Sequence, residues 1–306
     1  MFEDLAFSAL RISVPLVLAS LGGLLTFQAG VLNIALDGFM IIAAFAAVAS
    51  AYATGSLTLG ILAAVLCSMA LAALLVLFNL KFRAHIFIAG IAVTFMAYGL
   101  TALLLEGVFG QSGMFSSNLI PTFPALELPL LRDIPVLGAI LSGHTLLVYV
   151  TYLAVPVVWW LLYRTRWGLR LRVVGEAEDS AAAAGVNVAR IKVQAMLASG
   201  FFCGLAGAYL SLGYVSLFAK EMTNERGLIA IAAIIFAKGH PYASAVVALL
   251  FGAASALSIR LPEVTGLAPQ VLQLVPYVVT VLALIVVGLR QRQKRNRQGG
   301  WSFDIA

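Results

Sequence analysis

Asn33 and Asp37 are the residues of this sequence whose types and spacing are best suited to chemistry. A carboxamide and a carboxylate four residues apart share one face if the segment is helical. Both lie at the start of a long apolar run, where an ionised side chain is costly and is therefore usually functional. We predict that the pair contacts or gates a polar solute. The alternative is that Asp37, near the end of its run, reaches water or caps a helix.

A second, weaker polar stripe lies in the apolar run 86–105. Thr94 and Tyr98 fall within about two helical turns of each other and would extend the same solute path. The alternative is that the threonine hydroxyl bonds to its own helix backbone, as is usual in membrane helices. The predicted path is lined by Asn33, Asp37, Thr94 and Tyr98.

The sequence carries none of the side-chain patterns of an enzyme or a metalloprotein. It has no Ser/His/Asp, HExxH or CxxC arrangement and no GxxxxGK[ST] phosphate loop. His85, His144 and His240 fall near the ends of apolar runs without metal-ligand spacing. Apart from Asp37, the runs lack the buried acids of a proton-coupled pump. We therefore expect no catalytic residue, no metal and no cofactor in this chain, and an energy source outside it.

The elements that carry these residues must cross a membrane. Of the 306 residues, 62% are hydrophobic and only 10% are charged, and the mean hydropathy is +1.03. Hydrocarbon offers no partner to free backbone groups, so the spans must be helices. The sequence predicts an all-α, polytopic integral membrane bundle of roughly eight to ten transmembrane segments, forming a single domain over residues 1–306. The apolar runs fall at 8–27, 34–54, 57–80, 86–105, 144–163, 193–217, 228–237, 242–259 and 270–289.

The net charge of +6 is distributed as membrane topology requires. Lysine and arginine gather at 81–83, in the polar segment 164–192 and in the tail 290–306. Basic loops stay in the cytoplasm, so these segments and the C-terminus are assigned to that side of a plasma membrane. Parity then places the loop 106–143 and the N-terminus outside. The charge is explained by the lipid bilayer, and nucleic acid is not expected as a partner.

One apolar run is too short to cross a bilayer. Leu228–Ala237 has ten residues, which is about 15 Å of helix against roughly 30 Å of hydrocarbon. It ends at Lys238–Pro241, and a second run follows at 242–259. Two full spans and a re-entrant hairpin both fit this pattern. We expect a pair of helices of which the first is short or irregular.

The polar segment 164–192 contains the signals of a short helix. Ala181–Ala184 are strong helix formers, and the acids between Glu176 and Asp179 suit a helix N-terminus. Gly185 is placed to end the helix in the left-handed conformation. A short helix with a small apolar face can dock in a groove on a partner. The alternative is a solvated loop with a chance alanine run.

Four segments resemble the permeases of ABC importers, of the branched-chain amino acid, simple-sugar and nucleoside type. Leu32–Met40 reads LNIALDGFM and is similar to the NIGxEGxM pattern of that family. Gly168–Lys192 contains VGE and AGVNVARIK, and Gly227–Pro241 reads GLIAIAAIIFAKGHP. Leu274–Thr280 reads LVPYVVT before a basic tail, which resembles most the shorter nucleoside-type permease.

This resemblance implies a multi-subunit importer. Two permeases would form the channel, here this chain with a longer homologue, and an extracytoplasmic binding protein would deliver substrate. A separate cytoplasmic ABC ATPase would use ATP and magnesium, so the permease itself is not an enzyme. Val174–Asn187 would be the coupling helix that docks on the ATPase. The coupling residues implied are Gly175, Glu176, Asp179, Ala182, Gly185 and Asn187.

The sequence departs from the family pattern at two places. Asp37 stands where the family usually has glutamate, and Ala177–Glu178 stand where Asn-Pro is common. Neither departure affects the expected fold. The first leaves the role of that carboxylate to be established.

The expected substrates are nucleosides or related purine compounds. Simple sugars of the pentose type are the near alternative, because pentoses and nucleosides share a ribose-like ring. Branched-chain amino acids come third, since no charged pocket for ammonium and carboxylate groups is evident. A stand-alone secondary carrier would need a coupling residue inside the spans, and only Asp37 is available. A membrane-embedded enzyme would lack any set of acid, base or metal ligands.

Overall fold

The computed structural model describes residues 2–126 and 142–265 as a bundle of helices. Seven helices in these ranges are long and apolar enough to cross a membrane, and with one short helix they account for the first eight predicted runs. The ninth run, 270–289, and the tail 290–306 lie outside the described residues. The span-length helices are α1 (Phe2–Gln28), α2 (Leu36–Thr54), α3 (Leu57–Leu80), α4 (Ile86–Phe109), α7 (Leu146–Arg164), α10 (Val188–Ala208) and α12 (Pro241–Thr265).

The spans divide into central and peripheral helices. In α2, and in α10 with the π-helix that continues it, 72% of the most apolar stretch is buried, against 33% in α3, α4, α7 and α12. The peripheral helices expose large apolar side chains such as Phe95, Leu103 and Leu153. A surface of that kind is stable only against lipid or another protein. The predicted all-α membrane bundle is confirmed.

Two breaks in the helices bring non-helical backbone into the bundle. Residues 29–35 separate the end of α1 from the start of α2. The second break precedes α11 (Arg226–Phe236), which has only 11 residues and is followed by α12. The predicted pair with a short first helix is therefore confirmed. Free backbone groups at this depth need partners within the protein, which makes these breaks the natural places for a polar site.

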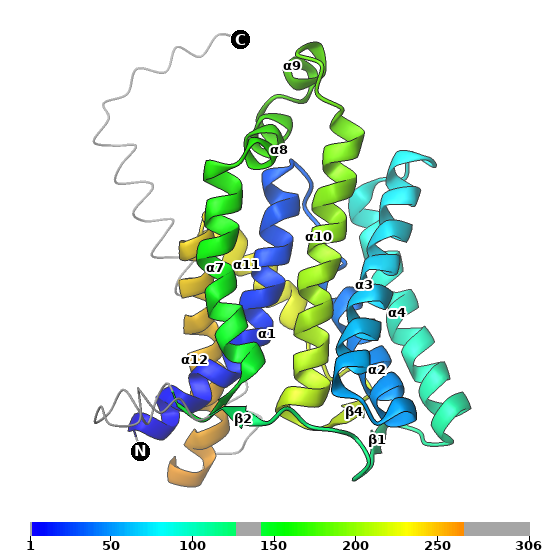
Figure 1. Ribbon diagram of the computed structural model, residues 1–306, viewed down its shortest axis with the longest axis vertical. Helices are drawn as coiled ribbons and strands as arrows, with labels where there is room; N and C mark the ends of the chain where they lie inside the picture. The colour runs from blue at the N-terminus through cyan, green and yellow to red at the C-terminus, as the bar shows by residue number, and fades with distance from the viewer. Residues whose placement is uncertain (1, 127–141, 266–306) are drawn as a thin grey trace.

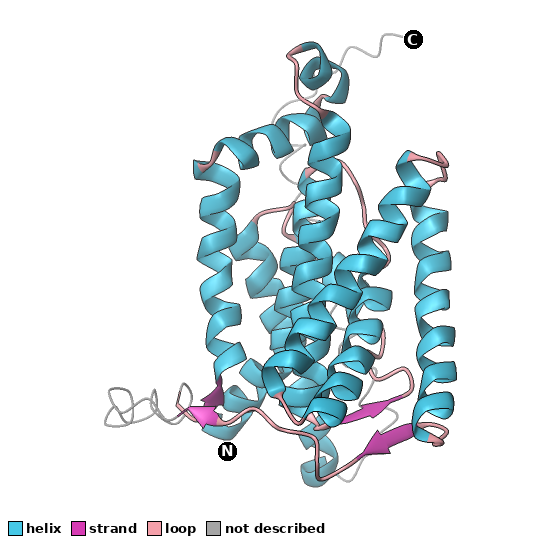
Figure 2. Cartoon of the chain, turned by 45° about the vertical axis from the view of Figure 1, so that its right-hand side comes forward, coloured by secondary structure: helices cyan, strands magenta, loops and turns pink. Residues whose placement is uncertain are grey.

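The two ends of the bundle carry different structures (Figure 1). One end holds α8 (Arg166–Glu176) and α9 (Glu178–Ala183), and we call it the α8 end. The opposite end holds the start of α1 and four short strands, as Figure 2 shows. This relative placement agrees with the expected topology, in which the N-terminus and the segment 164–192 lie on opposite sides.

The strands form two antiparallel pairs at the end opposite α8. β1 (Met114–Ser116) pairs with β4 (Leu217–Ala219). β2 (Ala125–Leu126) pairs with β3 (His144–Thr145). β4 follows the π-helix η1 (Tyr209–Tyr214) that ends α10. The first pair therefore attaches the described part of the loop 106–143 to the chain just before α11.

Candidate functional site

The carboxylate of Asp37 is the centre of a buried polar site. Asp37 is the second residue of α2 and is 4% exposed. Its Oδ1 accepts a hydrogen bond from the Gly227 backbone N–H at 2.9 Å. Its Oδ2 accepts from the Thr223 hydroxyl at 3.0 Å and from the Tyr98 hydroxyl. One carboxylate therefore joins α2, α4 and α11.

The start of α11 explains the position of this carboxylate. The first backbone N–H groups of a helix have no partner within it and carry a partial positive charge. Gly227 lies in the first turn of α11, so its N–H is one of these groups. A β-carbon on Gly227 would lie 2.4 Å from the Asp37 backbone nitrogen. Only glycine allows the two helix starts to come this close.

We expect the substitution Gly227→Ala to destabilise the protein by about 1–3 kcal/mol, because the methyl group overpacks a backbone contact. The midpoint of thermal unfolding in detergent measures the effect. The matched control is Gly99→Ala in α4, where a β-carbon would meet nothing within 4 Å. That control should leave stability unchanged or raise it slightly. Equal midpoints for the two variants would contradict the close approach of α2 and α11.

Asp37 also borders a cavity of about 780 Å³. The cavity lies between α4, α11 and the non-helical segment 29–35. The structure brings the predicted residues Asp37, Thr94 and Tyr98 together in its wall. The Thr94 hydroxyl bonds to the Gly90 carbonyl at 2.9 Å, which is the backbone contact weighed as the alternative. The complete lining is Leu32, Ile34, Asp37, Phe87, Ile91, Thr94, Phe95, Tyr98, Glu221, Asn224, Glu225, Leu228 and Ile231.

Asn33 has a different position from the one predicted. It precedes α2, which begins at Leu36, so Asn33 and Asp37 do not share a helical face and that prediction is wrong. The Asn33 side chain is 2% exposed, and it is not part of the cavity wall. Its Oδ1 accepts from the Ala35 N–H at 3.0 Å, and its Nδ2 donates to the Ser199 hydroxyl at 3.2 Å. Asn33 therefore fixes the turn into α2 and ties it to α10.

The sequence reasoning missed the polar residues that precede α11. Glu221, Asn224 and Glu225 line the cavity, and Thr223 bonds to Asp37. They fall between two apolar runs and so resemble an ordinary solvent-exposed loop. Their position in the sequence could have identified them, because they directly precede a helix that is too short to span the membrane. Such a helix starts inside the bundle, and the residues before it must then enter the bundle as well.

The second candidate site is the α8–α9 arm at the α8 end. α8 begins after Thr165, whose hydroxyl accepts from the Gly168 N–H at 3.1 Å as an N-cap. The Trp167 ring N–H donates to the Gln194 side-chain oxygen at 2.9 Å and attaches α8 to α10. The buried face of α8 holds Leu171 and Val174. α8 therefore attaches the arm to the bundle, and α9 projects beyond α8 (Figure 1).

The end of α9 agrees with the prediction. Gly185 has a left-handed φ of 80° and its N–H bonds to the Ala182 carbonyl at 2.9 Å. The Val186 N–H bonds to the Ala181 carbonyl at 3.0 Å, which completes a Schellman motif. Within α9 only Ala181 is buried, so Asp179 and Ala182 face outward. The short alanine-rich helix is confirmed.

Two residues near α9 lie differently from the prediction. Glu176 is the last residue of α8, so it does not belong to the N-terminus of the alanine-rich helix, which starts at Glu178. Asn187 is the N-cap of α10, and its side chain accepts from the Arg190 N–H at 2.9 Å. Glu176 is separated from α9 because the helix breaks at Ala177, where φ is −149°. Lys192 closes the arm with a salt bridge to Glu178 at 2.6 Å.

Comparison with known proteins agrees with this architecture. Residues 5–284 match the family model described as "Branched-chain amino acid transport system / permease component". The guanosine ABC transporter permease protein NupQ of Bacillus subtilis is 34% identical, over 93% of this chain and 92% of the relative. The nucleoside ABC transporter permease protein NupC of Lactococcus lactis is 33% identical, over 89% and 88%.

A third relative has a different named solute. TsgC13 of Haloferax volcanii is named provisionally as a glucose ABC transporter permease protein, and it is 32% identical over 94% of this chain and 92% of the relative. The family model and all three relatives extend over nearly the whole chain, as does the helical bundle. This chain belongs to the branched-chain amino acid transport system permease family and is a multi-pass membrane protein.

Proposed function

We propose that this chain is the permease subunit of an ATP-driven importer of nucleosides. The observation that carries the proposal is its similarity to NupQ and NupC, which are at least 33% identical to it over at least 88% of either chain. The chain holds no phosphate-binding loop of its own, so a separate ABC ATPase supplies the energy. Catalysis belongs to that ATPase.

The cavity beside Asp37 has the chemistry that a nucleoside needs. Phe87, Phe95 and Tyr98 provide aromatic surface for a planar base. Glu221 and Asn224 provide oxygen atoms that accept hydrogen bonds from sugar hydroxyls. Seven of the thirteen lining residues are apolar and six are polar or charged, and a wall that combines apolar surface with converging polar groups is typical of small-molecule sites. We therefore assign the solute path to the wall that contains Asp37, Thr94 and Tyr98.

The α8–α9 arm is proposed as the contact with the ATPase. Basic residues gather in 164–192, which supports a cytoplasmic position for the α8 end and for the C-terminus. The exposed residues of α9, Asp179 and Ala182, form the docking face. Gly175 and Glu176 set its angle from the end of α8, and Gly185 and Asn187 set its return into α10.

The remaining partners follow from the same assembly. A homologous permease would cover part of the apolar surface formed by α3, α4, α7 and α12, and we propose a heterodimer. An extracytoplasmic binding protein would deliver the solute at the end opposite α8, where the strands lie (Figure 2). Lipid covers the rest of the apolar surface.

Reconstitution tests the proposed substrate. The chain is incorporated into liposomes with its permease partner and ATPase, and the binding protein is added outside. We expect ATP-dependent uptake of radiolabelled guanosine that unlabelled adenosine reduces and that unlabelled leucine leaves unchanged. An ATPase variant without hydrolysis is the control and should abolish uptake. Uptake that persists with this control would contradict the importer assignment and favour a secondary carrier.

Sugar import is the second candidate, because TsgC13 is similar over nearly the full chain at 32% identity. The same liposomes distinguish the two. Uptake of ribose or glucose that excess guanosine does not reduce would replace the nucleoside assignment with a sugar assignment. Uptake of leucine alone would replace both.

A further inference from the structure

The short helix α11 is held by one polar side-chain contact at each end. At its start, the Gly227 N–H donates to Asp37 Oδ1 at 2.9 Å. Just beyond its end, the Gly239 carbonyl accepts from Gln28 Nε2 at 2.6 Å. Gln28 is the last residue of α1. α11 thus connects the cavity wall to the last turn of α1.

The backbone on both sides of α11 turns sharply. Glu221, Asn224 and Glu225 have φ values of 59°, 46° and 58° directly before the helix. Lys238 and Gly239 have φ values of 51° and 70° directly after it. Non-glycine residues rarely adopt this conformation, and such residues cluster at functional switch regions. These turns separate α11 from β4 and from α12.

The same last turn of α1 contacts the α8–α9 arm. Gly175 of α8 lies so close to α1 that a β-carbon there would be 2.2 Å from the Gln28 carbonyl oxygen. It would also be 2.8 Å from the Gly30 nitrogen. The Gln28 backbone therefore touches α8 while its side chain touches the end of α11. A displacement of α8 that moves this turn also moves Gly239.

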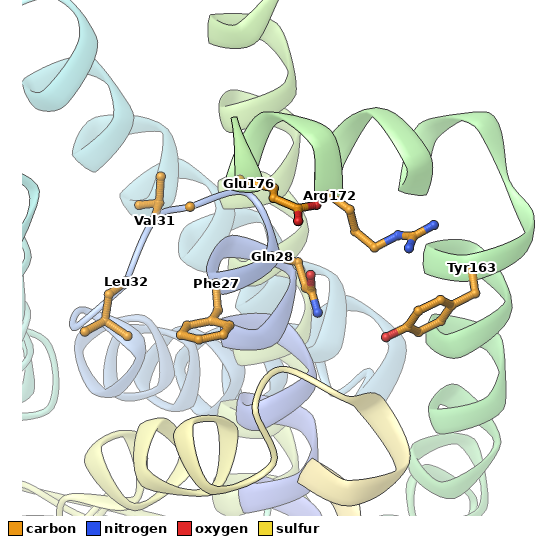
Figure 3. A pocket seen from close by; sticks show the side chains of 9 residues that line it. Phe27, Gln28, Val31, Leu32, Tyr163, Arg172 and Glu176 are labelled. Carbon is orange, nitrogen blue, oxygen red and sulfur yellow. The ribbon is translucent and has the colours of Figure 1, made fainter. Parts of the chain in front are cut away.

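An open cavity beside this contact gives it room to move. The cavity has a volume of about 590 Å³ and is lined by Gln28, Tyr163, Arg172, Gly175 and Glu176, among others. Figure 3 shows the side chains of Gln28, Tyr163, Arg172 and Glu176 around the opening between α1, α7 and α8. The Arg172 guanidinium lies over the Tyr163 ring at 4.8 Å. Closely packed interiors resist displacement, whereas this side of α8 borders an open cavity.

We propose that Gln28 is a positioning residue that couples α8 to α11, and through Gly227 to Asp37 and the solute cavity. The inference rests on the proposed function, because it needs the ATPase to displace the arm. Gln28 belongs neither to the wall of the solute cavity nor to α9. α11 also packs directly against α1 and α2. The Gln28 hydrogen bond adds a fixed point just beyond its end, through which a movement of the last turn of α1 is passed to Gly239.

A cysteine on α11 reports this movement directly. Leu228 lines the cavity and is 49% exposed, so Leu228→Cys places a reactive thiol in the wall. Cys67 is exposed and is first replaced by serine, while Cys203 is buried. Membrane vesicles with the complete transporter are treated with a water-soluble maleimide, with and without ATP and vanadate. The measurement is the ratio of the two labelling rates.

Two variants of Gln28 separate the hydrogen bond from the side-chain volume. Gln28→Met keeps the length of the side chain and removes the donor. Gln28→Lys keeps a donor for the Gly239 carbonyl. We expect ATP and vanadate to change the labelling rate at least about threefold in the parent, as a population shift between two positions of α11 requires. Gln28→Met should bring the ratio close to one, and Gln28→Lys should restore most of it.

The other outcomes are decisive as well. A parent-like ratio in Gln28→Met overturns the inference. Equal labelling rates with and without nucleotide, in a parent protein that imports guanosine, also overturn the inference. That result leaves the proposed function intact. A loss of assembled complex in both Gln28 variants makes Gln28 a structural residue and also overturns the inference. A parent without ATP-driven uptake refutes the proposed function itself.

Discussion

Asp37→Ala is expected to lower the rate of solute uptake at least about tenfold at equal amounts of assembled transporter. The methyl group removes the acceptor of the buried Gly227 N–H and of the Thr223 and Tyr98 hydroxyls. The two hydroxyls lie 3.1 Å apart and can bond to each other, so the Gly227 N–H is the buried donor that loses its partner. An unsatisfied buried donor costs about 1–3 kcal/mol, and 1.4 kcal/mol corresponds to a factor of ten. The start of α11 then loses its fixed position in the cavity wall. Uptake in proteoliposomes, normalised to purified complex, measures the loss.

Asp37→Asn is the matched control for this variant. Its carboxamide oxygen still accepts from the Gly227 N–H, and the Thr223 and Tyr98 hydroxyls can rotate to accept from the amide. We expect it to retain most of the uptake that Asp37→Ala loses. If alanine is as active as the parent, Asp37 has no part in fixing α11 or in the solute path. If asparagine is as inactive as alanine, the negative charge itself is required.

Ala182→Pro is expected to abolish coupling between ATP hydrolysis and uptake. Proline inside a helix removes one backbone hydrogen bond and its ring clashes with the carbonyl four residues earlier, at a cost of about 3 kcal/mol or more. α9 has only six residues, so it has no second turn to preserve its shape. Uptake should fall at least about tenfold, while the basal ATPase rate of the complex persists.

The control for this prediction changes the same position without breaking the helix. Ala182 is exposed, so Ala182→Ser adds a small polar group and keeps the backbone donor. We expect ATPase activity stimulated by the loaded binding protein to remain close to the parent value in serine and to vanish in proline. Normal stimulation in the proline variant would remove α9 from the ATPase contact.

The spans and the end of α9 were predictable because their signals are local. Hydropathy places a helix when consecutive residues are apolar. α9 ends shortly before Gly185 because the Gly185 and Val186 N–H groups bond to the carbonyls of Ala182 and Ala181. The length of the run at 228–237 predicted a short helix by simple geometry. These features depend on neighbours in the chain, which a single sequence displays.

The assembly of the site was not predictable in the same way. Thr223 and Gly227 reach Asp37 over 186 and 190 residues of chain. Nothing in the sequence near Asp37 indicates that the beginning of α11 lies against it. The predicted helical pairing of Asn33 with Asp37 was wrong for a related reason. Residues 29–35 are not helical, and the Asn33 side chain bonds to Ser199 of α10, 166 residues away in the chain. Tertiary contacts decided both cases.

The pairing of β1 with β4 connects the end of the bundle opposite α8 to the chain that leads into the cavity wall. β4 ends at Ala219, and Glu221 of the cavity wall follows two residues later. The Lys220 N–H also bonds to the Gly113 carbonyl, at 2.7 Å. A protein that binds to β1 would therefore contact a strand that is hydrogen-bonded to β4, directly before the cavity wall. We therefore expect insertions or exchanges in residues 110–116 to change solute preference without any substitution in the wall itself.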